Sequence, residues 1–396
     1  MFYGAAVSAM KPRENMLSLS MEEICLELAQ SDSYRVASAI ANRLMHRTGS
    51  DAIKHTTFKY RTVSAGKSIA LAYESTANTI LEGYDINPTA GLITEKSSVP
   101  ESVTKPSLPE TCDVPGVKAF IDKYNEEKKD REQITNAESV RKVEKSSDRC
   151  CYVSIDEIGV KHQIESRDSG AVKDRKYVEN TVIHIQYGEG QYTLTAVGMR
   201  NAFILLMSFL LANGLMEDKR LVFLSDGARC IKDYVHEFFG FREYTLILDW
   251  LHLKKKCKEY MSMGVKAKDK DAKNEIIRDL LRILWAGNTD DAIAYLSGLK
   301  QENVKSKKSL DDLIAYLERK KPYIHCYALR SLMGLRTSSN TVEKANDVNV
   351  AQRQKHNGMS WSKDGSRALA AITVAKHNNE LHNWIYSHQI VFKLVA

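Results

Sequence analysis

Residues 221–256 read LVFLSDGARCIKDYVHEFFGFREYTLILDWLHLKKK, and this stretch decides the fold. Two short apolar runs, 221–224 and 244–248, lack alternation of apolar and polar residues, which is typical of strands buried in a covered sheet. Asp226 and Asp249 stand at the ends of these runs, and each precedes a segment with helical spacing. Side chains at the carboxyl ends of parallel strands face the crevice where α/β folds bind ligands. The two aspartates are candidate site residues, with helix capping as the alternative role for each.

Three further strands are predicted upstream of this stretch. CYVSIDEIGVKHQ (151–163) is followed by a charged loop, and then by YVENTVIHIQYG (177–188) and QYTLTAV (191–197), joined by a tight turn. An apolar helix is predicted at 200–215. The resulting order βββαβαβ predicts an α/β fold with an RNase H-like mixed sheet.

Three acidic residues are expected to meet on this sheet. Asp156 lies inside an otherwise apolar strand, where a carboxylate is costly unless it is paired, hydrogen-bonded or bound to a metal. In an RNase H-like sheet the first and fourth strands are adjacent, which would place Asp156 beside Asp226. Glu343 begins the helix predicted at about 341–356, within reach of the same edge. Oxygen-only ligands favour Mg²⁺ or Mn²⁺, and two such ions suit in-line displacement at a phosphodiester.

Composition changes along the chain predict its division into domains. Five of the 7 prolines fall within 85–149, which indicates a linker, Pro-rich and then charged and solvated. The lysine-rich helical patterns of 253–335 indicate an all-helical insertion. The RNase H-like catalytic domain then consists of 150–252 and 336–396. Residues 1–84 form an N-terminal helical domain.

The N-terminal domain contains a possible helix-turn-helix. One amphipathic helix is predicted from residue 34, Gly49 interrupts it, and a second helix begins near 55. Lys59 and Arg61 lie early in this second helix, where basic side chains reach DNA phosphates. The alternative is an ordinary helical hairpin with solvated basic residues.

Four segments, YVSIDEIGV, LSDGARCIK, LDWLHLKKK and SNTVEKANDVNVAQRQKHNGMSWS, carry a family resemblance. They resemble bacterial insertion-sequence transposases of the DDE class, in the subgroup with a C-terminal Gly-Met-x-Trp-Ser signature that is distantly similar to Mutator-type enzymes. The resemblance implies Asp156, Asp226 and Glu343 as ligands of two Mg²⁺ or Mn²⁺ ions. It also implies Asp249-x-x-His252 as the element that follows the second acid, double-stranded DNA as partner, and a homodimer on paired DNA ends. The chain starts abruptly for such an enzyme, so we expect an end-recognition segment to be missing.

Several residues near the acids are candidate DNA contacts or auxiliary groups: Asp249, His252, Lys254, Lys255, Arg353 and Lys355. For His252 the alternative is a role in capping the helix that starts at 250. For the lysines it is a solvated helix face. Trp361 is interpreted as a packing residue that fixes the turn after the third acid.

The composition is that of a globular chain with a formal charge of +7, which favours an anionic partner such as DNA. The longest apolar segment, Ala202–Leu215, is too short to span a bilayer, and no signal peptide is recognisable in residues 1–15. The 7 cysteines show no zinc spacing. We therefore expect a bacterial cytoplasmic DNA transposase that cuts and joins strands at the ends of its element. The alternatives are a structure-selective nuclease of the same fold and a decayed DNA-binding copy.

Overall fold

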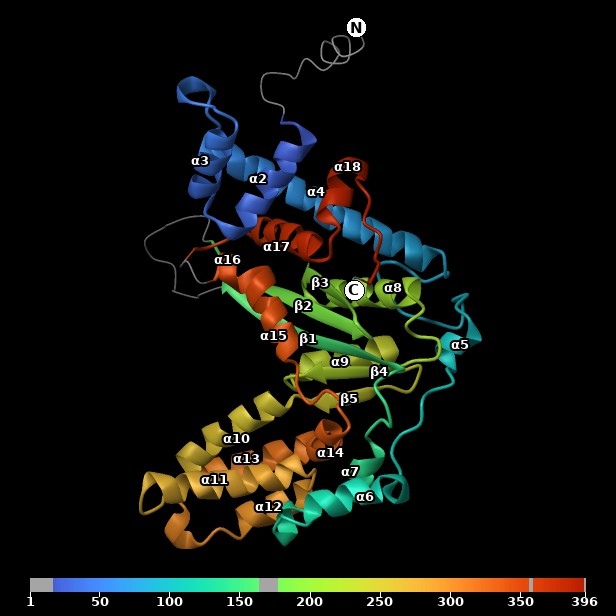
Figure 1. Cartoon of the computed structure of the whole chain (residues 1–396), viewed down its shortest axis with the longest axis vertical. Coiled ribbons are helices and arrows are strands. Elements are labelled where there is room, and N and C mark those ends of the chain that lie inside the picture. Colours follow the sequence, from blue (N-terminus) through green and yellow to red (C-terminus); the bar gives the residue numbers. More distant parts are fainter. Residues whose placement is uncertain (1–16, 164–176, 356–358, 395–396) are drawn as a thin grey trace.

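The computed structural model describes residues 17–163, 177–355 and 359–394. The expectations for the N-terminal 15 residues, for the charged loop after the first strand and for the end of the helix predicted at about 341–356 lie outside these ranges. Figure 1 shows an elongated arrangement, with N-terminal helices at one end, a sheet in the middle and a helical group at the other end. No helix in the described ranges is long and apolar enough to cross a membrane.

The centre of the molecule is a five-stranded mixed sheet of order β3-β2-β1-β4-β5. The first three strands pair antiparallel, and β4 pairs parallel with both β1 and β5. The predicted order of strands and helices along the chain is confirmed. The bounds are β1 (Cys150–Lys161), β2 (Tyr177–Tyr187), β3 (Gly190–Val197), α8 (Met199–Ala212), β4 (Arg220–Ser225), α9 (Arg229–Phe239) and β5 (Thr245–Leu248).

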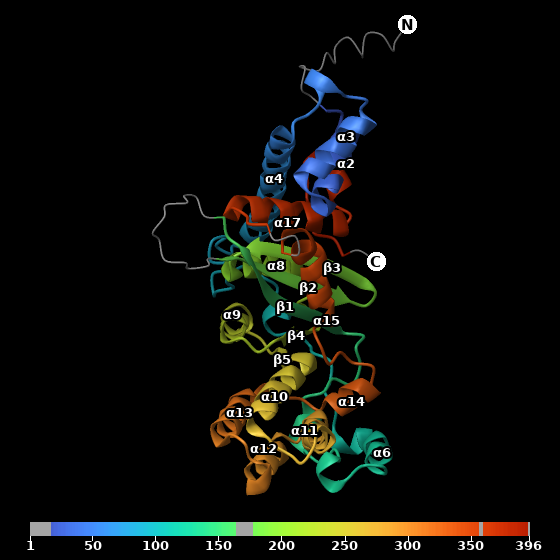
Figure 2. The same cartoon turned by 90° about the vertical axis from the view of Figure 1, so that its left-hand side faces the viewer.

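The two faces of the sheet are covered by different helices, because successive side chains of a strand point to opposite faces. Cys151, Val153 and Ile155 pack with α8 and α9 in one large apolar cluster. On the opposite face, Tyr152 packs against the helical insertion, while Ile158 packs against α15 (Asn340–Asn346). Figure 2 shows α9 and α15 on opposite sides of the sheet.

The insertion is all helical, as its sequence pattern predicts. Its apolar side chains, among them Leu253, Leu280 and Leu313, form one cluster that continues onto β4 and β5. The helices are α10 (Trp250–Gly264), α11 (Lys270–Trp285), α12 (Thr289–Ser297), α13 (Lys307–Lys320) and α14 (Tyr327–Leu332).

The segment before the sheet is packed and not solvated, which corrects the interpretation of its second half as a solvated linker. Val117 and Ile121, one turn apart on α6 (Val114–Asn125), are buried against Leu329 of α14. Glu144 and Arg330 form a fully buried ion pair with an Oε2–Nη1 distance of 2.5 Å. Burial alone would raise the pKa of Glu144, but the charges of Arg330 and His325 and the hydrogen bonds to the carboxylate together outweigh it, so the pKa lies below its usual value.

The N-terminal helices are α2 (Leu19–Ser31), α3 (Tyr34–Leu44) and α4 (His55–Glu82). The connection between α3 and α4 runs from residue 45 to 54, which is longer than the three- or four-residue turn of a helix-turn-helix. The long helix α4 begins where the sequence predicts, at residue 55, and packs against α8 and against α17 (Lys363–His377). Figure 1 shows α4 and α17 side by side.

The closest approach of α4 and α17 occurs at Gly66, and it yields a prediction. A Cβ at this position would lie 2.4 Å from the backbone oxygen of Ala368, so Gly66→Ala must push the helices apart. Overpacking of this kind costs about 1–3 kcal/mol, more than the roughly 1 kcal/mol that alanine gains in helix propensity. We therefore expect a lower free energy of unfolding in a denaturant titration. Ser64→Ala, on the exposed side of α4, is the control and should stay within about 0.5 kcal/mol of the parent. Equal stability of the two variants would contradict this packing.

Candidate active site

Asp156 and Asp226 lie side by side because of the register between their strands. Ile155 of β1 is paired with Ser225, the last residue of β4, in the parallel ladder, so Asp156 is the next residue of β1 and Asp226 the first residue after β4. Neighbouring strands are about 4.8 Å apart, and in-register residues of parallel strands point to the same face. The expectation that the first and fourth strands are adjacent is confirmed.

Asp156 stands between two apolar clusters on the insertion side of the sheet. Cys150 and Tyr152 belong to one cluster, Ile158 and Val160 belong to the other, and Asp156 shares their face because it also has an even number. Burial raises the pKa of Asp156, and the negative charges of Asp226 and Glu343 raise it further. Burial and the two neighbouring negative charges all disfavour the ionised form of Asp156.

Asp226 occupies the turn after β4 and does not cap α9. Its Oδ1 accepts a hydrogen bond from the Ala228 backbone N–H at 2.7 Å, while α9 starts without a side-chain cap. Gly227 has a φ of +82°, which a residue with a side chain rarely adopts. Lys320, from the end of α13, donates to the Gly227 carbonyl at 2.6 Å, and burial lowers the pKa of this lysine. The insertion thus holds the turn that carries Asp226.

Asp249, by contrast, caps a helix, so the two aspartates that look alike in sequence have different roles. Its Oδ1 accepts from the His252 backbone N–H at 2.7 Å, at the start of α10. Its Oδ2 accepts from both the backbone N–H and the hydroxyl of Ser339, the latter at 2.8 Å. Burial alone would raise the pKa of Asp249, but the hydrogen bonds from His252 and Ser339 outweigh it and the pKa is lowered. Asp249 thereby joins the segments that lead into and out of the insertion.

Glu343 and His252 face each other above the two aspartates. Glu343 lies in the first turn of α15, which crosses β1 and β2 (Figure 1). The His252 Nε2 atom is 3.9 Å from Glu343 Oε1, and its Nδ1 is 3.3 Å from Asp249 Oδ1. The hydrogen bond to Asp249 raises the pKa of His252, and the charges of Asp226 and Glu343 add to the effect. The imidazole of His252 thus lies between Asp249 and Glu343, and both carboxylates favour its protonated form.

Asn346 is a site residue that the sequence analysis missed. Its Nδ2 donates to Asp156 Oδ2 at 2.5 Å, from a position one helical turn after Glu343. The helix continues from Asn346 into a π-helical turn, Asp347–Ala351, a local widening that is frequent at functional sites. The three-residue spacing from Glu343 to Asn346 was the available signal, since such residues share a helix face.

The residues fit a divalent cation by their chemistry, because carboxylate and amide oxygens are the ligands that Mg²⁺ prefers. Asp156 and Asp226 are neighbours, and the pKa of Asp156 is raised by burial first and by the charges of Asp226 and Glu343 after it. Glu343 faces His252 in this structure. Within the described ranges, no three Asp, Glu, His or Cys side chains are close enough together to hold one ion. The structure brings Asp156 and Asp226 to neighbouring positions and leaves the metal-ligand role of all three acids a prediction.

The candidate DNA contacts differ in their exposure. Lys59, Lys255 and Lys355 are exposed, and Lys254 is half-buried on the same helix as His252. The structure corrects the interpretation of Arg353, which is 2% exposed. Its guanidinium lies over the Tyr34 and Trp361 rings, and its Nε donates to the Ala29 carbonyl at 3.0 Å, so it cannot reach a phosphate.

The packing role expected for Trp361 agrees with its position. Its ring is 5% exposed, and its Nε1 donates to the Gln354 carbonyl at 2.9 Å. Its backbone N–H and C=O are bonded to Lys161 and Gln163 at the end of β1. The tryptophan therefore fastens the segment after α15 to the strand that carries Asp156.

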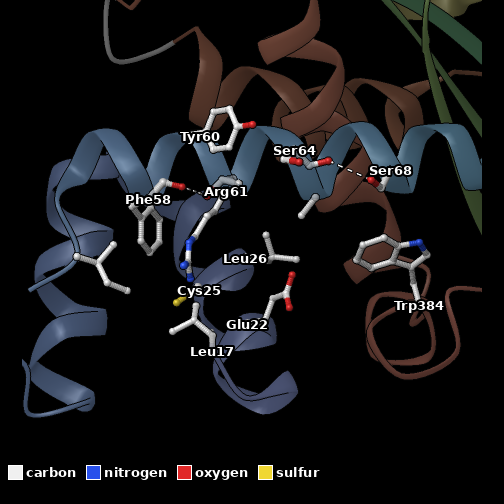
Figure 3. A pocket seen from close by; sticks show the side chains of 13 residues that line it. Leu17, Glu22, Cys25, Leu26, Phe58, Tyr60, Arg61, Ser64, Ser68 and Trp384 are labelled. Carbon is white, nitrogen blue, oxygen red and sulfur yellow. Dashed lines mark hydrogen bonds between the residues drawn. The ribbon is translucent and has the colours of Figure 1, made fainter. Parts of the chain in front are cut away.

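Arg61 lines a cavity of about 390 Å³ between α2, α4 and α18 (Leu381–Ser387). Figure 3 shows its guanidinium directed from α4 toward Cys25 on α2, near Glu22, while Trp384 closes the other side. The cavity is remote from the acidic group. Arg61 is thus directed between the N-terminal helices, whereas Lys59 on the same helix faces solvent.

Comparison with known proteins gives little support beyond this geometry. No protein-family model matches the chain, and no curated protein is significantly similar to it. One solved structure, the Drosophila P element transposase strand transfer complex, matches with a TM-score of 0.29 and 10% sequence identity, over 95% of this chain and 82% of that one. A match of this strength shows neither a shared fold nor a shared activity.

The Asp249–His252 pair predicts a pH-dependent stability. Asp249→Asn keeps a capping side chain but removes the charge that stabilises protonated His252. Because the pKa of Asp249 is lowered and that of His252 is raised, the pair contributes most between about pH 4 and 6.5. Its contribution disappears as the pH rises through the folded-state pKa of His252, and also as the pH falls through that of Asp249. Within the window the variant should lose about 1.5–3 kcal/mol of unfolding free energy.

Nuclear magnetic resonance titration measures the same effect directly. The His252 midpoint should fall in Asp249→Asn, while that of His184, whose pKa burial lowers to about 4, should not move. A stability difference that is constant from pH 5 to pH 9 would exclude the pairing.

Proposed function

We propose that this protein is a DNA transposase that cleaves DNA strands and transfers them at the ends of an insertion element, with divalent cations at Asp156, Asp226 and Glu343. The observation that carries the proposal is the register of β1 with β4, which brings the two aspartates together where the pairing ends. The position of Glu343 and His252 above them supports it. The strand order β3-β2-β1-β4-β5 supports the RNase H-like catalytic domain that the sequence resemblance implies.

The proposed reaction has two displacements at phosphorus. A water first attacks a phosphodiester at the element end, breaking the bond to the 3′ oxygen and leaving a 3′-hydroxyl. That hydroxyl then attacks a phosphodiester of target DNA, and the number of phosphodiester bonds is conserved in this second step. Bound Mg²⁺ or Mn²⁺ would supply electrostatic stabilisation of the attacking and leaving oxygens.

The residues of this chain have separate tasks in that reaction. Asp156 and Asp226 would hold the cations between them, and Glu343 would complete the site after leaving His252. The protonated His252 would then face a phosphate oxygen, held in orientation by its Nδ1 hydrogen bond to Asp249. Lys320 would keep the Asp226 turn in place from the insertion.

DNA would follow the basic start of α10. Lys254 and Lys255 come one turn after His252, and Lys255 is exposed there. Lysines of this kind neutralise phosphates without reading sequence. We further propose that the N-terminal helices, through Lys59, contact the element end and that two copies act together on paired ends.

Carboxylate substitutions test the proposal most simply. Asp156→Asn, Asp226→Asn and Glu343→Gln should each reduce strand cleavage by at least roughly 10³-fold, because groups that act as one unit fail together. The assay uses duplex DNA carrying the terminal repeats of the element and scores nicking and joining in Mg²⁺ or Mn²⁺. Ca²⁺, with its looser coordination, should not support the reaction.

Glu157→Gln is the matched control, since this exposed neighbour of Asp156 points to the opposite face and lies 3.9 Å from the Cys230 sulfur. It should retain activity, and all variants should bind DNA like the parent. Cleavage without joining would favour a structure-selective nuclease. Full activity in all three variants would refute the enzyme assignment.

Salt dependence tests the proposed DNA path along α10. The double variant Lys254→Ala/Lys255→Ala should lower the log–log slope of DNA affinity against salt by roughly 2, because each phosphate contact contributes about 0.9. Fluorescence anisotropy with a duplex at several salt concentrations gives the slope. Lys105→Ala, a surface lysine paired with Glu101, is the control and should leave the slope unchanged. An unchanged slope in the double variant would remove α10 from the DNA path.

A further inference from the structure

The side chain of Asn346 is the polar group that α15 places closest to Asp156. Its Nδ2 donates to Asp156 Oδ2 at 2.5 Å, and the other oxygen of Asp156 accepts the Glu157 backbone N–H at 2.8 Å. Each carboxylate oxygen has two lone pairs, so both remain able to accept one more partner. The two donors fix the rotation of the carboxylate about its Cβ–Cγ bond.

Asn346 is buried although half of its amide is unused. The residue is 6% exposed, and its Oδ1 has no hydrogen-bond partner within the part of the chain that the structure describes. Leaving a buried acceptor without a partner costs about 1–3 kcal/mol. A residue that served packing alone would not need a buried acceptor with this unfavourable free energy. Leucine, with nearly the same shape, would avoid it.

We propose that Asn346 is a positioning residue of the acidic site, which orients the Asp156 carboxylate toward the cation that it shares with Asp226. This inference rests on the proposed function, because it assumes that Asp156 is a cation ligand. The role is that of an outer partner: Asn346 acts through Asp156 and touches neither ion nor DNA. Such partners restrict the ligand to the orientation that binds, so that less rotational freedom is lost when the ion arrives.

The position of Asn346 on the helix gives the inference a second consequence. Asn346 and Glu343 are three residues apart and share one helix face, so the same turn of α15 orients Asp156 and carries the third acid. Movement of this turn would displace both groups together.

The experiment is a titration of the full chain with Mn²⁺ in the absence of DNA. Isothermal titration calorimetry measures the affinity. Asn346→Leu keeps the volume and removes the donor, and we expect its affinity for Mn²⁺ to fall by about 10- to 100-fold. Asn346→Ala, which cannot clash, should show the same loss and serves if the leucine variant is poorly folded. Thermal unfolding of each variant without metal measures any structural damage separately.

Asn349→Leu is the matched control. Asn349 is a buried asparagine of the same helix, one turn further on, and it bonds to the Ala345 carbonyl and to His377, both at 2.8 Å. It should be destabilised but retain the Mn²⁺ affinity of the parent. If both asparagine variants weaken Mn²⁺ equally, the effect is one of helix stability and the positioning role is wrong.

The remaining outcomes separate this inference from the proposed function. If the parent binds Mn²⁺ and Asn346→Leu binds it equally well, Asn346 has no positioning role, but the metal site stands. If the parent binds no Mn²⁺, or if Asp156→Asn binds it as well as the parent, the proposed metal site fails, and the inference fails with it.

Discussion

The buried carboxylate of Asp249 is the contact on which the arrangement of the site depends. One oxygen caps α10 through the His252 backbone, and the other holds Ser339, although 90 residues separate Asp249 from Ser339 along the chain. The long insertion therefore leaves and rejoins the sheet at one point. Because α15 starts directly after Ser339, this contact sets where Glu343 lies relative to the strands. Without this contact, the start of α15, and with it Glu343, would lose a direct link to the end of β5.

The acidic group is assembled against its own electrostatic repulsion. Burial already disfavours charge on Asp156, and Asp226 and Glu343 add like charges beside it. The surrounding structure opposes this with groups held from different elements: Asn346 from α15, His252 from α10 and Lys320 from α13. Local destabilisation by like charges is typical of sites that bind a cation or a substrate.

The sequence was sufficient for the parts of the fold that depend on local pattern. The strand order, the helical insertion and the mid-strand position of Asp156 follow from periodicity and from the cost of a carboxylate in an apolar strand. The adjacency of β1 and β4 required the additional assumption of a fold type. Local sequence could not distinguish Asp226 from Asp249, since both precede a helix, and only the distant Ser339 shows that the second one is a structural cap.

Other features depend on contacts between residues far apart in the chain. Apolar residues such as Val117 and Ile121 are too few in their segment to predict a buried helix from sequence. Their packing partners are around Leu329, far away in the chain. Arg353 looks like a phosphate ligand in sequence because arginine is rarely buried. Its burial depends on Tyr34 and Trp361, from opposite ends of the chain. Asn346 carries no charge, and although its spacing from Glu343 places both on one helix face, its contact with Asp156 became visible only in three dimensions.

The central claim is that Asp156 and Asp226 are ligands of a shared divalent cation. Anomalous X-ray scattering from crystals soaked in Mn²⁺ tests it most directly, because the signal locates the ions without any assumption about activity. The account predicts an anomalous peak in contact with oxygens of both aspartates, about 2–2.5 Å from each, and a Glu343 side chain turned from His252 toward it. A peak bound elsewhere, or none near Asp156 at millimolar Mn²⁺, would contradict the account.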